Sequence, residues 1–413
     1  MANRLFIIDN GGVSSQYGIG TYLHELVGAL ANSNIEIVVV EIFSYHSSIE
    51  IVVKGHCTYL YLPDWNRECK LGIDYDSQYL RNVVVYLAVH FNRNSDDIPI
   101  FHLNFVNLLF IKALKRYMNC FVIVTIHFTP WDFVYKGDEE RVLHLWRERY
   151  KLNGLGVEKL IEQIENFYQS FILCDKIICL TQRRKNCFLN MFDIDVNKYV
   201  VIPNALNDKY LPYDQVTTVN SKRKLLKNSK VKIILYVGRL DSGKNIDSLI
   251  RCYKRTLNVY SNSHLVIVGS GNYELLLRVI DLEVIDKISF VGFVDKKKLA
   301  EIYSVADIGV MCSIHEEFGY AAVEMMMNSI PLIISNTSGI AEFLENYYAK
   351  IPVFCKEGII DEDLLTKLLL EFLMNDKLSV KVANLVRSKY EEYFSITLYT
   401  IRMLALYNDL FSN

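Results

Sequence analysis

The sequence predicts an α/β protein built from two parallel-sheet domains, and three observations support this. The chain has 413 residues, which is long enough for about two domains of roughly 200 residues. Short runs rich in Val, Ile and Phe alternate with amphipathic stretches almost from end to end, a pattern typical of βαβ units. A polar, basic segment at 214–232 has no apolar period and separates two such series.

Strands are expected wherever the apolar runs occur, with helices between them. The runs in the first half are 4–9, 35–42, 58–62, 100–104, 121–127, 176–180 and 199–203, and those in the second half are 232–238, 264–269, 288–294, 307–313 and 331–335. After Pro352 the strand pattern stops, so the rest of the chain is expected to be helical. We therefore predict an N-terminal domain over 1–210, a C-terminal domain over 211–390, and a helix within 391–413 that packs back on the domains.

The composition restricts the classes of partner. The formal net charge is -2 and 51% of the residues are apolar, which favours a globular protein without a nucleic-acid partner. The nine cysteines form no Cys-x-x-Cys pair, so neither a disulfide framework nor a metal site is expected. The apolar run at the N-terminus is too short for a signal peptide, and we expect a cytoplasmic protein. The 27 tyrosines and 21 phenylalanines leave peripheral contact with the inner face of the membrane open.

A glycine-rich stretch, DNGGVSSQYGIGTY, follows the first predicted strand. Gly11 and Gly12 allow a ligand to approach the backbone closely, and Gly18 and Gly20 leave the next helix N-terminus uncovered for an anion. The stretch does not match G-x-G-x-x-G. However, Glu41 ends the second predicted strand, where dinucleotide-binding folds place a ribose-binding acid. An NAD-dependent oxidoreductase is therefore an alternative, as is a simple tight turn.

A second motif, LYVGRLDSGKNI, places two cations after a strand in the second half. Arg239 follows Gly238 directly, and Lys244 lies five residues later, at the start of a predicted helix. Two positive side chains at a strand end, beside a helix N-terminus, suit a diphosphate group. The alternative is a pair of solvated surface cations.

The stretch HEEFGYAAVEMM, at 315–326, combines acids with a helix start. Glu316 is expected in the loop after a strand, and Gly319 permits a close backbone approach. The free N–H groups from Phe318 onward can bind a phosphate, and Glu324 can accept hydrogen bonds from both hydroxyls of a ribose. Acids that complement the helix dipole would explain Glu316 but not Glu324.

HEEFGYAAVEMM resembles the Glu-x7-Glu motif of the retaining glycosyltransferases of family 4, and VGRLDSGKN resembles the diphosphate motif of the same family. The segments at 201–206, 288–313 and 331–344 also follow the family pattern in order. The resemblance implies the GT-B architecture, in which two Rossmann-like domains face a central cleft.

The resemblance also implies roles for individual residues. Arg239 and Lys244 would hold the diphosphate, Glu324 the ribose, and Glu316 the transferred sugar. His127, at the end of a predicted strand, matches a histidine that faces this sugar; a buried core histidine is the alternative. The expected catalytic residues are His127, Arg239, Lys244 and Glu316, and the expected donor-binding residues are Gly12, Arg239, Lys244, Val294, Glu316, Phe318, Gly319, Tyr320 and Glu324.

The function implied is transfer of a sugar from a nucleoside diphosphate sugar, UDP- or GDP-linked, to a hydroxyl group with retention of configuration. Such transfer would serve glycan or glycoconjugate synthesis, with no bound metal and no further cofactor. The acceptor is left open between a glycan, a lipid-linked glycan, a protein and a small molecule. Besides the oxidoreductase, a nucleotide-sugar-binding protein without transferase activity is an alternative.

Overall fold

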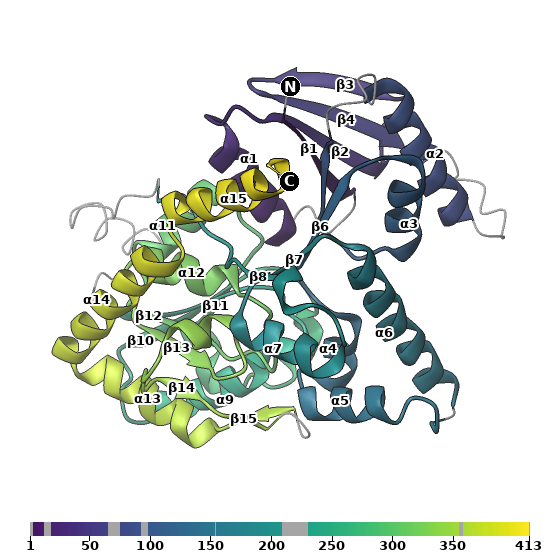
Figure 1. The fold of residues 1–413 in the computed structure, drawn as a ribbon. Coiled ribbons are helices and arrows are strands. Elements are labelled where there is room, and N and C mark those ends of the chain that lie inside the picture. Colours follow the sequence, from purple (N-terminus) through teal and green to yellow (C-terminus); the bar gives the residue numbers. More distant parts are fainter. Residues whose placement is uncertain are drawn as a thin grey trace. The chain divides into compact units, whose positions relative to one another are not determined.

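The computed structural model describes residues 3–11, 18–64, 75–91, 98–152, 154–208, 230–354 and 358–412 of the chain. These residues form two compact units, and each is a parallel sheet with helices packed on it (Figure 1). The first unit consists of Met1–Trp131, Glu139–Ala205 and Ile396–Asn413, and the second of Asp132–Asp138 and Leu206–Ser395. The predicted fold class, with two parallel-sheet α/β domains, is confirmed.

The sheet of the first unit has eight strands in the order β3-β4-β2-β1-β5-β6-β7-β8. They are β1 (Arg4–Asn10), β2 (Glu36–Ser44), β3 (Glu50–Lys54), β4 (Cys57–Pro63), β5 (Ile100–Leu103), β6 (Phe121–Ile126), β7 (Lys176–Cys179) and β8 (Tyr199–Val201). All seven strands predicted in this half are present. The edge strand β3 was not predicted. It pairs antiparallel with β4 and is mostly exposed, unlike the buried strands that the apolar runs predict.

Helices and one C-terminal segment cover this sheet. They are α1 (Gly18–Leu30), α2 (Tyr75–Phe91), α3 (Leu108–Tyr117), α5 (Glu139–Arg147), α6 (Leu155–Leu173), α7 (Gln182–Met191), the 3-10 turn η2 (Val196–Lys198) and α15 (Ile396–Phe411). Most of α4 (Pro130–Tyr135) belongs to the second unit. In Figure 1, α15 lies beside α1, although the two are at opposite ends of the chain. Buried aromatic side chains fill much of the core, among them Trp131, Phe171 and Phe188.

The second sheet has six parallel strands in the order β11-β10-β9-β12-β13-β14. They are β9 (Lys232–Val237), β10 (Ser263–Val268), β11 (Ile288–Gly292), β12 (Ile308–Met311), β13 (Leu332–Ser335) and β14 (Lys350–Ile351). All five predicted strands are present. The expectation of a purely helical chain after Pro352 is wrong, because β15 (Val353–Phe354) and β16 (Ile359–Ile360) form a two-stranded antiparallel ribbon. Strands of two residues are too short to produce a sequence period.

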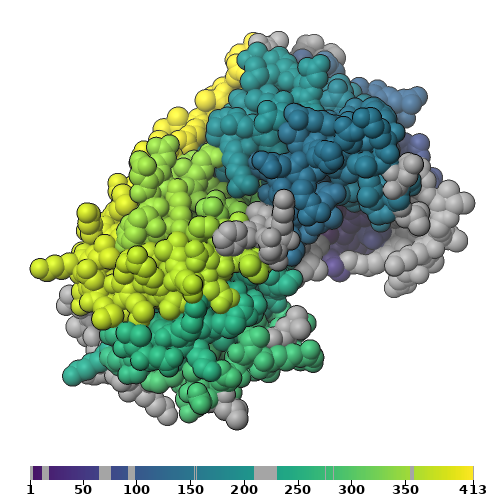
Figure 2. All heavy atoms as spheres, turned by 90° about the horizontal axis from the view of Figure 1, so that it is seen from below, coloured from purple at the N-terminus to yellow at the C-terminus, as the bar shows by residue number. Residues whose placement is uncertain are grey.

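The helices of the second unit are α9 (Ile246–Leu257), α10 (Tyr273–Leu277), α11 (Lys296–Tyr303), α12 (Tyr320–Met327), α13 (Glu362–Met374) and α14 (Asp376–Tyr393). Short 3-10 turns add η3 (Ser242–Lys244), η4 (Leu282–Lys287) and η5 (Gly339–Phe343). In the space-filling view, green residues and the yellow-green residues of the later helices form adjoining surfaces of this unit (Figure 2).

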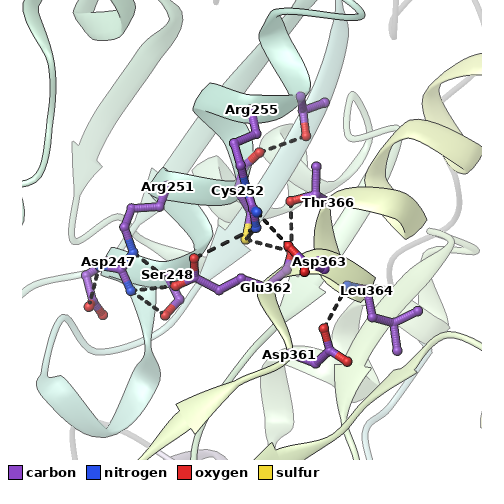
Figure 3. A network of polar contacts seen from close by, with 11 residues as sticks. Asp247, Ser248, Arg251, Cys252, Arg255, Asp361, Glu362, Asp363, Leu364 and Thr366 are labelled. Atoms are coloured by element: carbon purple, nitrogen blue, oxygen red, sulfur yellow. Dashed lines mark hydrogen bonds and ion pairs between the residues drawn. The ribbon is translucent and has the colours of Figure 1, made fainter.

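A polar network joins α9 to the start of α13 (Figure 3). The guanidinium of Arg251 donates to Glu362 Oε1 from Nε at 3.0 Å and from Nη2 at 2.6 Å. Arg255 Nη1 donates to Asp363 Oδ1 at 2.7 Å. Asp361 caps α13 by accepting from Leu364 N at 2.9 Å. Because α9 follows η3 directly, this network also fixes the helix that begins beside Lys244.

None of the helices in the described part of the chain is long and apolar enough to cross a bilayer. The structure forms no disulfide bond among the seven cysteines that it describes.

Replacement of Gly269 by alanine tests the close approach of the strand ends in the second sheet. Gly269 has φ of +139°, and a Cβ there would lie 1.8 Å from the carbonyl oxygen of Gly238. We expect Gly269→Ala to destabilise the protein by about 3 kcal/mol, seen as a thermal midpoint lowered by several degrees. Gly28→Ala is the control, since Gly28 lies in α1 with no heavy atom within 4 Å of the added Cβ. This change should stabilise α1 slightly; equal midpoints for the two variants would contradict the prediction.

Candidate active site

The second sheet changes direction between β9 and β12, which are neighbours. From β9 the chain proceeds to β10 and β11 on one side, and then returns to β12 on the other side. Ligands of open parallel sheets bind outside the carboxyl ends of the strands at such a point. The loop after β9 carries Arg239 and Lys244, and the loop after β12 carries Glu316, so the topology brings these two predicted motifs to the same edge.

Backbone contacts join the two loops directly. Ile314 N donates to the carbonyl of Gly243 at 2.8 Å. The buried thiol of Cys312 donates to the carbonyls of Lys244 at 3.3 Å and Asn245 at 3.4 Å. Asn245 has φ of 53°, in the left-handed region, so the chain turns sharply there before α9 begins. These contacts hold the end of η3 against the segment that leads to Glu316.

Lys244 and Glu316 form an ion pair, with the ammonium donating to Oε2 of the carboxylate. The side chains are 14% and 21% exposed. Ser313 Oγ also donates to this carboxylate, at 3.2 Å, and Gly339 N donates to the Glu316 carbonyl at 2.8 Å. Burial acts to raise the pKa of Glu316, but the Lys244 charge and hydrogen bond outweigh it and hold the pKa below its ordinary value. The carboxylate is therefore ionised at neutral pH.

Arg239 lies at the surface of the loop after β9. Its guanidinium is 51% exposed, and Nη2 lies 3.3 Å from Asp241 Oδ2. Its backbone is anchored, because the buried Tyr236 donates from its hydroxyl to the Arg239 carbonyl at 2.9 Å. An anchored backbone with an accessible cation suits the binding of an anion from solution.

The start of α12 provides backbone N–H groups. Gly319 is the N-cap, with φ of 98° and no capping side chain. A Cβ at this position would lie 3.2 Å from Cγ of the Glu316 side chain, and φ of 98° is in the region that favours glycine. The ring of Phe318 is buried and packs against the rings of Tyr320 and Phe394, at centroid distances of 5.3 and 5.7 Å. The Phe318 side chain is therefore part of the core.

Glu324 projects from the second turn of α12. Its Oε2 accepts a hydrogen bond of 2.6 Å from the hydroxyl of Tyr303, the last residue of α11. Burial raises the pKa of Glu324, and the Tyr303 hydrogen bond opposes part of this effect. Val294, expected near the base of a nucleotide, is half-buried and lies two residues after the end of β11.

The first unit contains the predicted glycine loop and His127. Gly12 lies outside the described residues, but Gly11 follows β1 directly and donates from N to the Ile42 carbonyl at 2.9 Å. A Cβ on Gly11 would lie 2.8 Å from Glu41 Cγ. Burial and the Glu41 charge raise the pKa of the neighbouring Asp9 to about 6. The end of β1 therefore packs tightly against the end of β2.

His127 follows β6, and its ring packs edge-on against Tyr22 at a centroid distance of 4.4 Å. The Tyr22 hydroxyl lies 3.3 Å from Thr125 Oγ1 and 3.4 Å from His102 Nε2. His102 also lies 2.7 Å from the hydroxyl of Tyr407 in α15. Burial lowers the pKa of both histidines to about 3, with the His127 charge adding to the effect on His102, so both are neutral at physiological pH.

Among the residues that the structure describes, one group could hold a metal ion. It consists of Asp132, His315 and Glu317, whose ligand atoms lie within 4.8 Å of one another. His315 Nε2 is 3.4 Å from Asp132 Oδ2 and 3.9 Å from Glu317 Oε2. A protonated imidazole between two carboxylates would produce the same arrangement, so the group does not by itself indicate a metal. Sequence reasoning missed this group because Asp132 is more than 180 residues away from the other two.

Sequence reasoning also missed Tyr303, Tyr22 and His102, which surround predicted site residues. Tyr303 could have been suspected because it ends an amphipathic helix just before β12. No sequence period distinguishes His102 from the apolar residues of β5, since all four residues of that strand are buried.

The chain is therefore an α/β protein with two parallel-sheet units, and its second sheet carries a pair of cation and acid, Lys244 and Glu316, at the point where the strand order reverses. The family model for glycosyltransferase family 4 matches residues 17–210, and the model for glycosyl transferases group 1 matches residues 218–389. The chain belongs to glycosyltransferase family 4.

Known proteins share parts of the sequence. An uncharacterized glycosyltransferase of Methanocaldococcus jannaschii is 32% identical over 187 residues, which is 44% of this chain and 47% of that protein. The O-antigen chain mannosyltransferase RfbU of Salmonella typhimurium is 29% identical over 193 residues, which is 44% of this chain and 50% of RfbU. The matches thus span about half the length of these relatives.

Solved structures share the fold over nearly the whole chain. Sucrose-phosphate synthase from Thermosynechococcus elongatus has a TM-score of 0.75 at 18% identity and covers 99% of both chains. HepE of Anabaena, solved with UDP and glucose, has a TM-score of 0.70 at 12% identity and covers 97% of this chain and 98% of HepE. The comparisons lend no support to an NAD-dependent oxidoreductase.

The pH dependence of stability tests the ion pair between Lys244 and Glu316. Because the folded-state pKa of Glu316 is lowered, its contribution is present above the unfolded pKa and is lost as the pH falls through the folded value. Lys244→Met leaves the carboxylate buried without its cation. We expect a loss of about 2 to 3 kcal/mol in the free energy of unfolding at pH 7.

The loss should become smaller as the pH falls, because burial without the Lys244 charge raises the pKa of Glu316, so that the carboxyl takes up a proton at a higher pH in the variant than in the unaltered protein. Urea unfolding at pH 7 and pH 4 measures both quantities. The double variant Lys244→Met/Glu316→Gln is the control, since removing both charges should cost less than removing the lysine alone. An equal loss at both pH values would contradict the role given to the pair.

Proposed function

We propose that the protein is a glycosyltransferase that moves a sugar from a nucleoside diphosphate sugar to an acceptor hydroxyl, with retention of configuration and without a bound metal or further cofactor. The observation that carries the proposal is the ion pair between Lys244 and Glu316 at the edge between β9 and β12, with Arg239 in the loop after β9 and the start of α12 in the loop after β12. Membership of family 4 supports the class of reaction.

The barrier to such a transfer is the breaking of the bond at the anomeric carbon. An oxocarbenium-like centre develops there, while negative charge grows on the departing diphosphate. Arg239, with its half-exposed guanidinium, is available to oppose this negative charge. Lys244 contributes a second cation, and a phosphate near it competes with the Glu316 carboxylate for the ammonium group. The uncapped N–H groups of α12 add a third source of positive potential.

The two acids bind hydroxyl groups rather than attack carbon in this proposal. Glu324 accepts from the ribose, and Glu316 accepts from hydroxyls of the transferred sugar, because ionised carboxylates are strong acceptors. His127 remains neutral and can therefore bind a sugar hydroxyl without adding charge to the reaction centre. The proton of the acceptor passes to the departing phosphate oxygen on the same face, so no side-chain nucleophile is needed.

The nucleotide is a UDP or GDP group in this proposal. The solved complex of HepE with UDP and glucose supports a uridine donor. The likeness to the mannosyltransferase RfbU supports a hexose as the transferred sugar. The acceptor belongs to one of four classes: a glycan, a lipid-linked glycan, a protein or a small molecule. A cytoplasmic protein, at the inner face of the membrane if the acceptor is a lipid, would meet such donors.

A donor panel tests the proposal. UDP-, GDP- and ADP-sugars are added to the full chain, and the thermal midpoint and the slow hydrolysis of each sugar are measured, with the anomer of the released sugar identified by NMR. We expect one nucleotide to raise the midpoint and to support hydrolysis that first releases the anomer present in the donor. Binding without hydrolysis or transfer would indicate a nucleotide-sugar-binding protein instead. Binding of NAD without binding of any nucleotide sugar would favour an NAD-dependent oxidoreductase.

Removal of the Arg239 guanidinium should affect turnover far more than folding. Loss of one preorganised donor to developing charge commonly lowers the rate by about 10² to 10³, and we expect this for Arg239→Ala. Arg239 is half-exposed, so the thermal midpoint should change little. Arg278→Ala is the matched control, because Arg278 is an exposed arginine of the same unit that pairs with Glu274 at 2.8 Å. Equal activity of the two variants would show that Arg239 does not act on the departing diphosphate.

A further inference from the structure

The hydrogen bond between Tyr303 and Glu324 joins the end of α11 to the second turn of α12, whose other buried side chains are apolar. The buried residues of α12 are Ala322, Val323, Met325, Met326 and Met327, and Glu324 is the half-buried acid among them. An apolar side chain would pack here without the cost of placing a carboxylate out of water. A carboxylate held at this position by a buried hydroxyl therefore indicates that a ligand uses the acid.

The geometry divides the two oxygens of the carboxylate between different partners. Oε2 accepts from the Tyr303 hydroxyl at 2.6 Å, and Tyr303 is only 4% exposed, so its ring cannot swing away without disturbing the core. The aromatic ring leaves the hydroxyl few alternative positions. The Tyr303 hydrogen bond therefore restricts the rotation of the carboxylate, and it leaves one lone pair of Oε2 and both lone pairs of Oε1 for further donor groups.

We infer that Tyr303 is a positioning residue that orients Glu324 for a ribose with both hydroxyls, and that this pair makes the protein select ribonucleoside over deoxyribonucleoside diphosphates. The inference rests on the proposed function, in which Glu324 binds the ribose of the donor. A carboxylate in a fixed plane can accept from two neighbouring hydroxyls at once, whereas a carboxylate free to rotate keeps this arrangement for only part of the time. Loss of the 2′-hydroxyl removes one of these hydrogen bonds.

Calorimetric titration with UDP, GDP and ADP, and with the 2′-deoxy form of each, tests the inference. The full chain should bind one of the ribonucleotides at least about tenfold more tightly than its deoxy counterpart, as expected for one hydrogen bond to a charged acceptor. Tyr303→Phe should weaken binding of that ribonucleotide by about tenfold and binding of the deoxy form by less than about twofold, so that the preference largely disappears.

Two further variants separate positioning from a merely structural role. Tyr347→Phe is the matched control, because Tyr347 is also buried and its hydroxyl donates to the carbonyl of Leu332, away from Glu324. It should leave both affinities unchanged. Glu324→Asp keeps the charge but withdraws it from Tyr303, and it should lose the same preference, which keeps the test available if Tyr303→Phe does not fold.

The outcomes distinguish the inference from the proposed function. If none of the nucleotides binds the unaltered chain, both fail. If a ribonucleotide binds without preference over its deoxy form, or if Tyr303→Phe weakens both forms equally or neither, the inference alone is overturned. Loss of the preference in Tyr303→Phe and Glu324→Asp, with Tyr347→Phe unchanged, establishes it.

Discussion

The ion pair between Lys244 and Glu316 is the interaction on which the candidate site of the second unit depends. It joins the loop after β9 to the loop after β12, the two strand ends between which the sheet reverses its order. A buried carboxylate is costly without a cation, and a buried cation is costly without an acceptor, so each residue requires the other. The pair therefore keeps the Lys244 ammonium and the Glu316 carboxylate at one edge of the second sheet. The diphosphate and the sugar of the proposed donor would bind at this edge.

Other contacts in the second unit hold the two segments that carry Lys244 and Glu316. The Cys312 thiol and the Ile314 amide attach the β12 loop to the end of η3. Arg251 and Arg255 attach α9 to α13, which lies more than 100 residues later in the chain. Helix α9 therefore has little freedom to carry Lys244 away from Glu316. Rigid support of this kind is what a site needs when its groups must meet developing charge without rearranging.

In the first unit, burial rather than an ion pair sets the charge state of His127. His127, His102 and Tyr22 share a polar cluster inside an otherwise apolar core, and α15 closes the cluster through Tyr407. Because burial keeps both histidines neutral, each imidazole carries a single N–H. The two ring nitrogens of His102 face the hydroxyls of Tyr407 and Thr125, each of which can donate or accept. The last helix of the chain therefore contributes to the environment of a residue in its first third.

The sequence by itself determined the fold class and nearly all of the parallel strands, because a buried strand needs a continuous apolar run that no distant residue can replace. It also placed Arg239, Lys244, Glu316 and Glu324 at strand ends and a helix start. Only the tertiary structure decided that Lys244 pairs with Glu316 and that Tyr303 holds Glu324. Those partners lie 72 and 21 residues apart. Their contact depends on strand order and helix packing, for which the sequence carries no local period.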